Sequence, residues 1–396
     1  AGLAIRAVAR FKDDQGAIET VYSNADEGGN PNEPATGVVT ISDPTPTEGL
    51  TLTVNASAIQ DPDGLGPFSL QWQSSNDNGG TWADIGGATA LSFTPGQAQV
   101  GQLLRVAVSF TDGGGTLETV ASAPTGIVGD NWVGTPLQNN TFNGTDGDDI
   151  ATGVSPAPGG NDTLNGNGGD DILNGAGRTD TLNGGAGNDQ LSGGAGADGA
   201  VFAGDVAGFG PGSSDANIIV KDLAGAEGTD TLSSIQTLRF AGTNYTVVPG
   251  NAGNNANLNG ANGAAGLQAV FGFAGTDSMN GGAGNDLLVG GEGNDTVRGN
   301  AGNDTIYWTA GDGRDLVNGD NAAANIAGTV DTMKIAGDTS AEIYRIYSRA
   351  EADIAGFTGL NANTEILITR NGTDNASLIL ELNNIEEIVI NGSGSG

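Results

Sequence analysis

The strongest constraint on this chain is a nine-residue repeat that occurs in two separate arrays. In the first array, from Gly166 to Phe202, consecutive copies read GNGGDDILN, GAGRTDTLN, GGAGNDQLS and GGAGADGAVF. The second array consists of four copies, Gly272–Asn280, Gly281–Val289, Gly290–Arg298 and Gly299–Tyr307. Each copy is close to the pattern Gly-Gly-x-Gly-x-Asp-x-apolar-x, with departures such as Arg178 where Gly is expected. A strict period with a regular apolar position argues against a disordered Gly/Asp/Asn-rich linker, which is the main alternative.

Three positions of the repeat determine its chemistry. Glycines permit turns with positive φ and let carbonyl oxygens face one point. Position 8 is mostly apolar and gives each short strand one side chain to bury. Position 6 is an aspartate in nearly every copy, including ragged copies before the first array and a partial copy after the second. These aspartates are Asp149, Asp162, Asp171, Asp180, Asp189, Asp198, Asp277, Asp286, Asp295, Asp304 and Asp315.

The pattern resembles the RTX family of calcium-binding repeats. The resemblance implies a right-handed parallel β-roll in which two nonamers make one turn and each repeat lies beside the one two ahead. It also implies several calcium ions, roughly three or four in the first array and two to four in the second. The ions would bind the position-6 carboxylates and carbonyls near positions 1 and 3. These carbonyls are those of Gly166, Gly168, Gly175, Gly177, Gly184, Ala186, Gly193, Ala195, Gly272, Ala274, Gly281, Ala283, Gly290, Glu292, Gly299 and Ala301. Such an all-oxygen ligand set favours calcium over zinc or copper.

Charge and composition agree with a chain that collects cations. The chain has 47 acidic and 13 basic residues, a net charge of -34, which argues against binding to nucleic acid or anionic membranes. No apolar run has membrane-spanning length, so we expect no membrane insertion. Rows of aspartates repel each other without metal, so we expect the arrays to fold only when calcium is present. RTX proteins of this kind are secreted by type I export, which implies an extracellular or cell-surface location in a Gram-negative bacterium.

The chain contains neither cysteine nor histidine. The HExxH and His-dependent GxSxG sites of RTX proteases and lipases are therefore excluded. A glycosidase that uses only carboxylates stays open as an alternative, because two acidic residues are sufficient for that chemistry. The repeats already account for every dense acidic cluster, so we expect no enzymatic activity in this chain.

The N-terminal region contains a second kind of repeat. Residues 1–24 align without gaps with residues 100–123, and Asp13 and Glu19 are among the residues that are identical 99 positions later. We expect a β-hairpin that occurs twice, with residues 1–28 as the end of an incomplete copy and 36–128 as a complete one. The complete copy resembles a bacterial immunoglobulin-like sandwich without the cysteine pair of antibody domains. Its predicted strands are Val38–Ile41, Leu50–Val54, Phe68–Ser74, Leu91–Thr94, Leu103–Phe110 and Leu117–Ser122.

Two features of the sandwich have alternative interpretations. Trp72 is expected to anchor the core, and the alternative is a sugar-binding platform formed with Trp82. Asp61 and Asp63, in the sequence QDPDG, form a turn in one interpretation and hold a calcium ion at a domain junction in the other.

The remaining segments frame the arrays. We expect the first roll over 144–202, a β-rich cap over 203–249, the second roll over 250–320 and a β-rich C-terminal region over 329–391 with a short helix near Arg349–Ala355. The cap contains GTDTLSSIQTLRF, which is similar to segments that close RTX arrays. The C-terminal region is expected to be either a cap or part of a secretion signal, and the final GSGSG to be a flexible end.

The expected fold is therefore all-β, with an immunoglobulin-like β-sandwich followed by two calcium-binding parallel β-rolls and β-rich capping segments. The expected function is a non-enzymatic, calcium-folded module of a secreted protein, such as a stalk, an adhesin or a surface-layer or fibre element. Its partners would be calcium and, beyond calcium, either further copies of itself or a cell-surface glycan. The alternative is the C-terminal tail of a secreted enzyme, because the combination of this sandwich with RTX arrays resembles large secreted peroxidase-like proteins.

Overall fold

The computed structural model describes residues 6–23, 32–154, 160–214, 217–223, 225, 227–260, 266–320, 329–337 and 341–391. The C-terminal GSGSG lies outside this part of the chain. So do residues 157–159, the start of the ragged copy that contains Asp162. The chain divides into two compact units. Unit 1 comprises residues 1–44, 50–94 and 102–126, and unit 2 comprises 45–49, 95–101 and 127–396.

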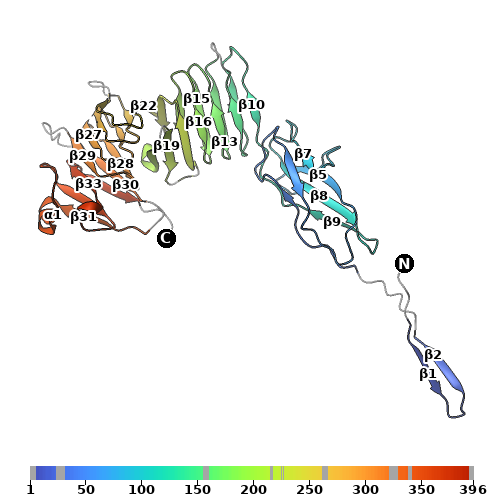
Figure 1. Ribbon diagram of the computed structural model, residues 1–396. Coiled ribbons are helices and arrows are strands. Elements are labelled where there is room, and N and C mark those ends of the chain that lie inside the picture. Colours follow the sequence, from blue (N-terminus) through green and yellow to red (C-terminus); the bar gives the residue numbers. More distant parts are fainter. Residues whose placement is uncertain are drawn as a thin grey trace. The chain divides into compact units, whose positions relative to one another are not determined.

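Unit 1 contains a separate hairpin and two small antiparallel sheets (Figure 1). The sheets have the strand orders β3-β4-β7 and β6-β5-β8-β9. All six predicted strands are present, and β6 is an addition that the sequence pattern did not indicate. The strands are β1 (Val8–Lys12), β2 (Ile18–Tyr22), β3 (Thr40–Ile41), β4 (Leu52–Asn55), β5 (Ser69–Ser75), β6 (Ala83–Asp84), β7 (Ser92–Phe93), β8 (Leu103–Thr111) and β9 (Leu117–Ala121).

Trp72 joins the two sheets of unit 1. Its side chain on β5 is 0% exposed, and its ring centroid lies 5.4 Å from that of Phe93 on β7. The prediction of a core anchor is confirmed. The alternative of a sugar platform is wrong, because a fully buried ring offers no face to a ligand. Trp82 is instead covered by the guanidinium group of Arg105, 4.3 Å from its ring centroid.

The hairpin of β1 and β2 has the same register as the hairpin of β8 and β9. Phe11 pairs with Glu19 in the first, and Phe110 pairs with Glu118 in the second. Each turn is closed by an aspartate, Asp13 or Asp112, whose Oδ1 accepts the backbone N–H four residues later at 2.8 or 2.7 Å. The expectation that one hairpin occurs twice is confirmed.

Unit 2 begins as a parallel β-roll in which alternate repeats contribute to two sheets (Figure 1). Position-8 side chains pair two repeats apart, Leu164 with Leu182 in one sheet and Leu173 with Leu191 in the other. All four leucines are buried, and this pairing confirms the predicted register. The strands of this part are β10 (Asn131–Val133), β11 (Thr141–Asn143), β12 (Ile150–Thr152), β13 (Thr163–Gly168), β14 (Ile172–Asn174), β15 (Thr181–Ala186), β16 (Gln190–Ser192) and β17 (Gly199–Phe202).

The segment between the arrays continues the roll. β20 adds in parallel to β16, and β21 adds in parallel to β17, which places Leu232 beside Leu191 and Leu238 beside Ala200. β22 turns back along β21 and then pairs in parallel with β24 of the second array. An eleven-stranded sheet therefore runs through both arrays. The elements are η1 (Val206–Gly208), β18 (Phe209–Ser214), β19 (Asn217–Asp222), β20 (Thr229–Ser233), β21 (Thr237–Phe240), β22 (Thr243–Pro249), β23 (Leu258–Asn259) and β24 (Gln268–Phe271).

The C-terminal region extends both sheets of the second roll. β30 and β34 lengthen the eleven-stranded sheet, and β33 pairs in parallel with β29 in the other. The predicted short helix is present as α1, with a capping box between Ser348 and Glu351. The elements are β25 (Ser278–Ala283), β26 (Leu287–Val289), β27 (Thr296–Ala301), β28 (Thr305–Thr309), β29 (Asp315–Asp320), β30 (Thr332–Ala336), β31 (Tyr344–Ser348), α1 (Arg349–Ala355), β32 (Ile366–Arg370), η2 (Asn375–Ser377), β33 (Leu378–Asn383) and β34 (Glu387–Asn391).

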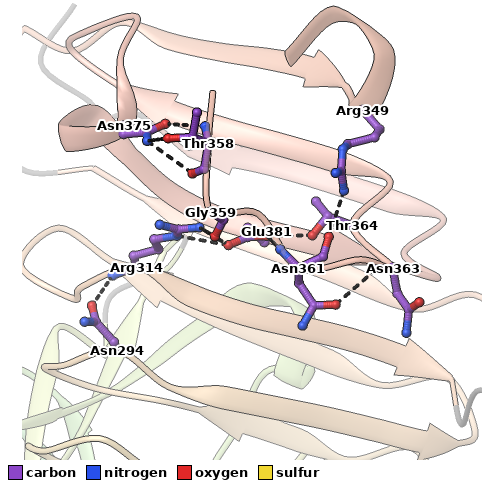
Figure 2. A network of polar contacts seen from close by, with 10 residues as sticks. All are labelled: Asn294, Arg314, Arg349, Thr358, Gly359, Asn361, Asn363, Thr364, Asn375 and Glu381. Carbon is purple, nitrogen blue, oxygen red and sulfur yellow. Dashed lines mark hydrogen bonds and ion pairs between the residues drawn. The ribbon is translucent and has the colours of Figure 1, made fainter. Parts of the chain in front are cut away.

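A polar network holds the loop after α1 against the roll. Figure 2 shows Glu381 of β33 between Arg314 and the loop residues Asn361 and Thr364. Glu381 forms an ion pair with Arg314 and accepts hydrogen bonds from the Asn361 N–H at 2.7 Å and the Thr364 hydroxyl at 2.6 Å. Within the described part of the chain, no helix has the length and apolarity needed to cross a membrane.

Candidate metal centre

A ladder of hydrogen bonds connects the position-6 aspartates. The backbone N–H of most position-6 aspartates donates to Oδ1 of an aspartate one turn ahead, as in Asp171 to Asp189 at 2.8 Å. The distance is 2.7 to 2.9 Å in both arrays. Parallel strand pairing dictates this geometry, because the 18-residue register places equivalent residues of successive turns side by side. Oδ1 is thereby committed to the backbone, and Oδ2 points elsewhere.

The second carboxylate oxygen of most ladder aspartates is buried without a hydrogen-bond partner. The side chains are 0% to 2% exposed. Burying a carboxylate oxygen without a partner costs several kcal/mol, so such a row is unfavourable unless something compensates it. The unpartnered atoms are Oδ2 of Asp171, Asp180, Asp189, Asp198, Asp277, Asp286, Asp295, Asp304 and Asp331.

Position-1 glycines lie where these carboxylate oxygens and a backbone carbonyl oxygen converge, and a side chain there would collide with both. A Cβ placed on Gly281 would lie 2.8 Å from Oδ2 of Asp286 and 2.9 Å from the carbonyl oxygen of Gly299, the position-1 residue two repeats ahead. The same carboxylate and carbonyl atoms converge at Gly166, Gly272 and Gly299. Carboxylate and carbonyl oxygens that converge in this way suit a hard cation such as calcium. The predicted position-6 and position-1 donors therefore fit the ion.

The predicted position-3 carbonyls are arranged differently. Those of Ala186, Ala195, Glu292 and Ala301 already accept backbone hydrogen bonds at 2.7 to 2.9 Å. The other four lie at strand ends or isolated bridges and are Gly168, Gly177, Ala274 and Ala283. A carbonyl oxygen has two lone pairs, so a backbone hydrogen bond leaves a second contact available. Their role as ligands stays a prediction.

The first aspartates of the row differ from the others. Oδ1 of Asp149 accepts hydrogen bonds from the Asp130 N–H and the Thr145 hydroxyl, and its Oδ2 accepts from the Thr145 N–H at 2.7 Å. Oδ1 of Asp162 accepts the Asn140 N–H at 2.8 Å. Hydrogen bonds from backbone and side-chain donors thus already stabilise the carboxylates at this end of the roll. Both carboxylate oxygens of Asp149 therefore have hydrogen-bond partners.

The structure adds ladder residues that the period did not reveal. Asp230 in the segment between the arrays accepts the Asp189 N–H at 2.9 Å, and Asp331 after the second array accepts the Asp304 N–H at 2.8 Å. Both are followed two residues later by a buried apolar residue, Leu232 or Met333. This Asp-x-apolar spacing is the signal that could have identified them. Three amides, Gln236, Asn255 and Gln268, occupy the remaining ladder positions around the segment between the arrays.

Burial raises the pKa of these carboxyl groups. It raises the pKa of Asp171 to about 8, against the hydrogen bond from Asp149 and with added repulsion from neighbouring carboxylates. Burial also raises the pKa of Asp230 to about 8 and that of Asp304 to about 7. The metal-free site therefore prefers protons to negative charge. A cation that replaced those protons would remove the same penalty.

Asp171→Asn tests whether calcium-dependent folding needs the charge of a ladder carboxylate. The new amide oxygen still accepts the Asp149 N–H, but the ligand loses its charge. We expect the calcium concentration at the folding midpoint to rise on the order of tenfold, equivalent to about 1.4 kcal/mol. Asp170→Asn is the matched control, because Asp170 is exposed in the same repeat, and it should leave the midpoint unchanged. The midpoints are measured by far-UV circular dichroism. Equal midpoints for the two variants would contradict the assignment of Asp171 as a calcium ligand.

The raised pKa values also predict a pH dependence. A folded-state pKa above the unfolded value of about 3.9 stabilises the metal-free roll at low pH, and this stability is lost as pH rises through the folded-state pKa. For Asp171, Asp230 and Asp304 that loss falls around pH 7 to 8. In a chelator, β-structure should therefore be greater near pH 5 than near pH 8. The calcium midpoint should rise as pH falls, because protons compete for the same oxygens. A calcium midpoint that does not depend on pH would count against this account.

Comparison with known proteins agrees with this geometry. A family model described as the RTX calcium-binding nonapeptide repeat (4 copies) matches residues 159–177, 174–199 and 271–306. Another, for a domain of unknown function (DUF8696), matches 34–128. Among solved structures, the extracellular lipase LipA from Serratia marcescens matches with 20% identity over 65% of this chain and 38% of the lipase, at a TM-score of 0.28. No curated protein matches the chain. The family model thus identifies the two nonapeptide arrays of this chain as RTX calcium-binding repeats.

Proposed function

We propose that this chain is a non-enzymatic structural module that folds on calcium outside the cell, as a stalk, an adhesin segment or an element of a surface layer or fibre. The observation that carries the proposal is a pair of rows of buried carboxylates with unpartnered oxygens, one between Asp171 and Asp198 and one between Asp277 and Asp331. The rows make the fold of unit 2 depend on a cation. RTX repeats typify extracellular proteins exported by type I secretion, and a Gram-negative source fits that route.

The energetics of the metal-free arrays support calcium-dependent folding. Each repeat buries one apolar side chain of moderate size, which contributes about 1.5–3 kcal/mol at most. Ordering nine residues costs roughly 1–2 kcal/mol each in backbone entropy, and glycine-rich segments are the most expensive to order. The buried carboxylates add repulsion to this deficit. Calcium sites of extracellular modules have a Kd on the order of 0.1–1 mM, so the chain would be unfolded in the cytosol and folded outside it.

The architecture supports a mechanical role more than a catalytic one. The eleven-stranded sheet joins both arrays and the segment between them. The hairpin of unit 1 occurs twice with one register, as expected of tandem modules. The acidic rows of unit 2 are engaged in the ladder. The alternative role, a folding and secretion tail of a secreted enzyme, is supported by the same arrays and differs in requiring a catalytic domain elsewhere in the protein.

A calcium titration of the full chain tests calcium-dependent folding and separates an element that assembles from one that stays monomeric. We expect a transition from disorder to β-structure near millimolar calcium, and none with magnesium, which needs near-ideal octahedral geometry. Light scattering recorded in parallel distinguishes the roles. Growth of scattering with the transition supports a lattice or fibre element, and an unchanged monomer supports a stalk or tail. A far-UV spectrum that ignores calcium would rule out the metal-folded module.

A further inference from the structure

The sandwich of unit 1 contains an acidic cluster that is separate from the nonapeptide rows. Asp61 and Asp63 lie in the loop between β4 and β5, and Asp112 lies in the turn between β8 and β9. One carboxylate oxygen from each of the three lies within 4.8 Å of the others. The aspartates of the rolls are brought together by the nonapeptide period. These three residues lie in loops outside that period, so it does not explain why they converge. An acidic cluster alone is common on protein surfaces, so its meaning depends on burial and partners.

Asp112 is the residue that distinguishes this cluster from a solvated acidic patch. Its side chain is only 6% exposed. Oδ1 accepts the Thr116 N–H at 2.7 Å, but Oδ2 is buried without a hydrogen-bond partner. Oδ2 of Asp61 is buried and unpartnered as well. Two such oxygens beside a third carboxylate are strongly unfavourable unless a cation compensates them.

Backbone contacts hold the two loops together at this point. The Gly113 N–H donates to the carbonyl oxygens of Asp63 at 3.1 Å and Gly64 at 3.2 Å, and the Asp63 N–H donates to Oδ1 of Asp61 at 2.7 Å. A Cβ on Gly113 would collide with the Asp63 carbonyl. The carboxylates are therefore fixed in place before any ligand arrives, which lowers the cost of binding.

A fourth carboxylate connects the cluster to the segment that leads into the sandwich. Glu118 on β9 lies next to Asp61, and its negative charge disfavours a second negative charge there. Its oxygens accept hydrogen bonds from the Asn32 side chain and the Ala35 N–H, both at 2.7 Å. Oδ2 of Asp63 accepts the Glu33 N–H at 2.8 Å. The cluster thus holds residues 32–35 as well as its own loops.

The repeated hairpin carries the same acidic pair. Asp13 and Glu19 occupy the positions of Asp112 and Glu118, with the same strand register and the same aspartate-closed turn. The turn alone requires only one acceptor oxygen from the aspartate, which asparagine would also supply. Retention of both carboxylates in both hairpins is what a repeated charge-dependent site would require.

We propose that Asp61, Asp63, Asp112 and Glu118 form a calcium site in the sandwich that fixes residues 32–35 against the loops at that end of the unit. The donors are carboxylate oxygens, which suit calcium and exclude the softer metals that prefer nitrogen or sulfur. The site is independent of the proposed function of the rolls, because all its residues lie in unit 1. The opposing interpretation is a turn whose aspartates only cap backbone N–H groups.

The test compares calcium binding by the full chain with that of Asp61→Asn/Asp112→Asn. Both amides keep the acceptor oxygens for the Asp63 and Thr116 N–H groups, so the turns persist. We expect equilibrium dialysis against labelled calcium to show the loss of one bound ion per chain. The control Asp14→Asn/Asp84→Asn removes the same charge from exposed positions of unit 1 and should lose none. Far-UV circular dichroism follows the calcium-dependent gain of β-structure in the rolls, and the midpoint of that transition should be unchanged in both variants.

Thermal unfolding gives a second measurement on the same proteins. Without calcium, the cluster variant should be at least as stable as the wild type, because two repelling charges are gone. With calcium, the wild-type sandwich should gain stability and the variant should not. An unchanged ion count in a folded variant overturns the proposal and leaves the turn interpretation. If the double variant does not fold, Glu118→Gln, which retains an acceptor for the Ala35 N–H, should also lose the ion, and an unchanged count there is equally contradictory.

Discussion

The hydrogen bond that Oδ1 of each position-6 aspartate accepts from a backbone N–H of the preceding turn determines the rest of unit 2. It uses one oxygen of every aspartate to fix the register of the parallel strands. The same bond buries the other oxygen next to a position-1 carbonyl. Strand register and cation site are consequently the same structural feature. A chain that adopts this register without a cation must either protonate the row or leave charge buried, and both reduce its stability at neutral pH.

The segment between the arrays shows how far this interaction extends. It lacks the glycine period, yet Asp230 continues the ladder and β20 and β21 keep the parallel register. Around it, Gln236, Asn255 and Gln268 occupy ladder positions with uncharged side chains. The row of negative charge is thus interrupted where the two arrays meet, while the sheet and the core remain continuous. We infer two groups of ions on one folded unit.

The nonapeptide period predicted the register, the buried position-8 residues and the aspartate row, because each property repeats with the period. It could not predict that β22 would turn back along β21 and then pair in parallel with β24. Strand pairing in an aperiodic segment depends on long-range packing. Asp331 was missed for a related reason, because the sequence between it and Asp304 does not keep the nonapeptide period. In unit 1, the sequence located the strands and predicted Trp72 as the core anchor, but only the structure showed that a carboxylate oxygen of Asp112 is buried without a partner.

Hydrogen–deuterium exchange of the full chain across a calcium titration tests most directly whether the ladder and the cation form one cooperative unit. We expect that amides of both arrays and of β20 and β21 become protected together, at one calcium concentration, and exchange freely in chelator. Protection of the arrays at clearly separate concentrations would show that the continuous sheet does not couple them. Protection that persists in chelator at neutral pH would contradict the dependence of the fold on a cation.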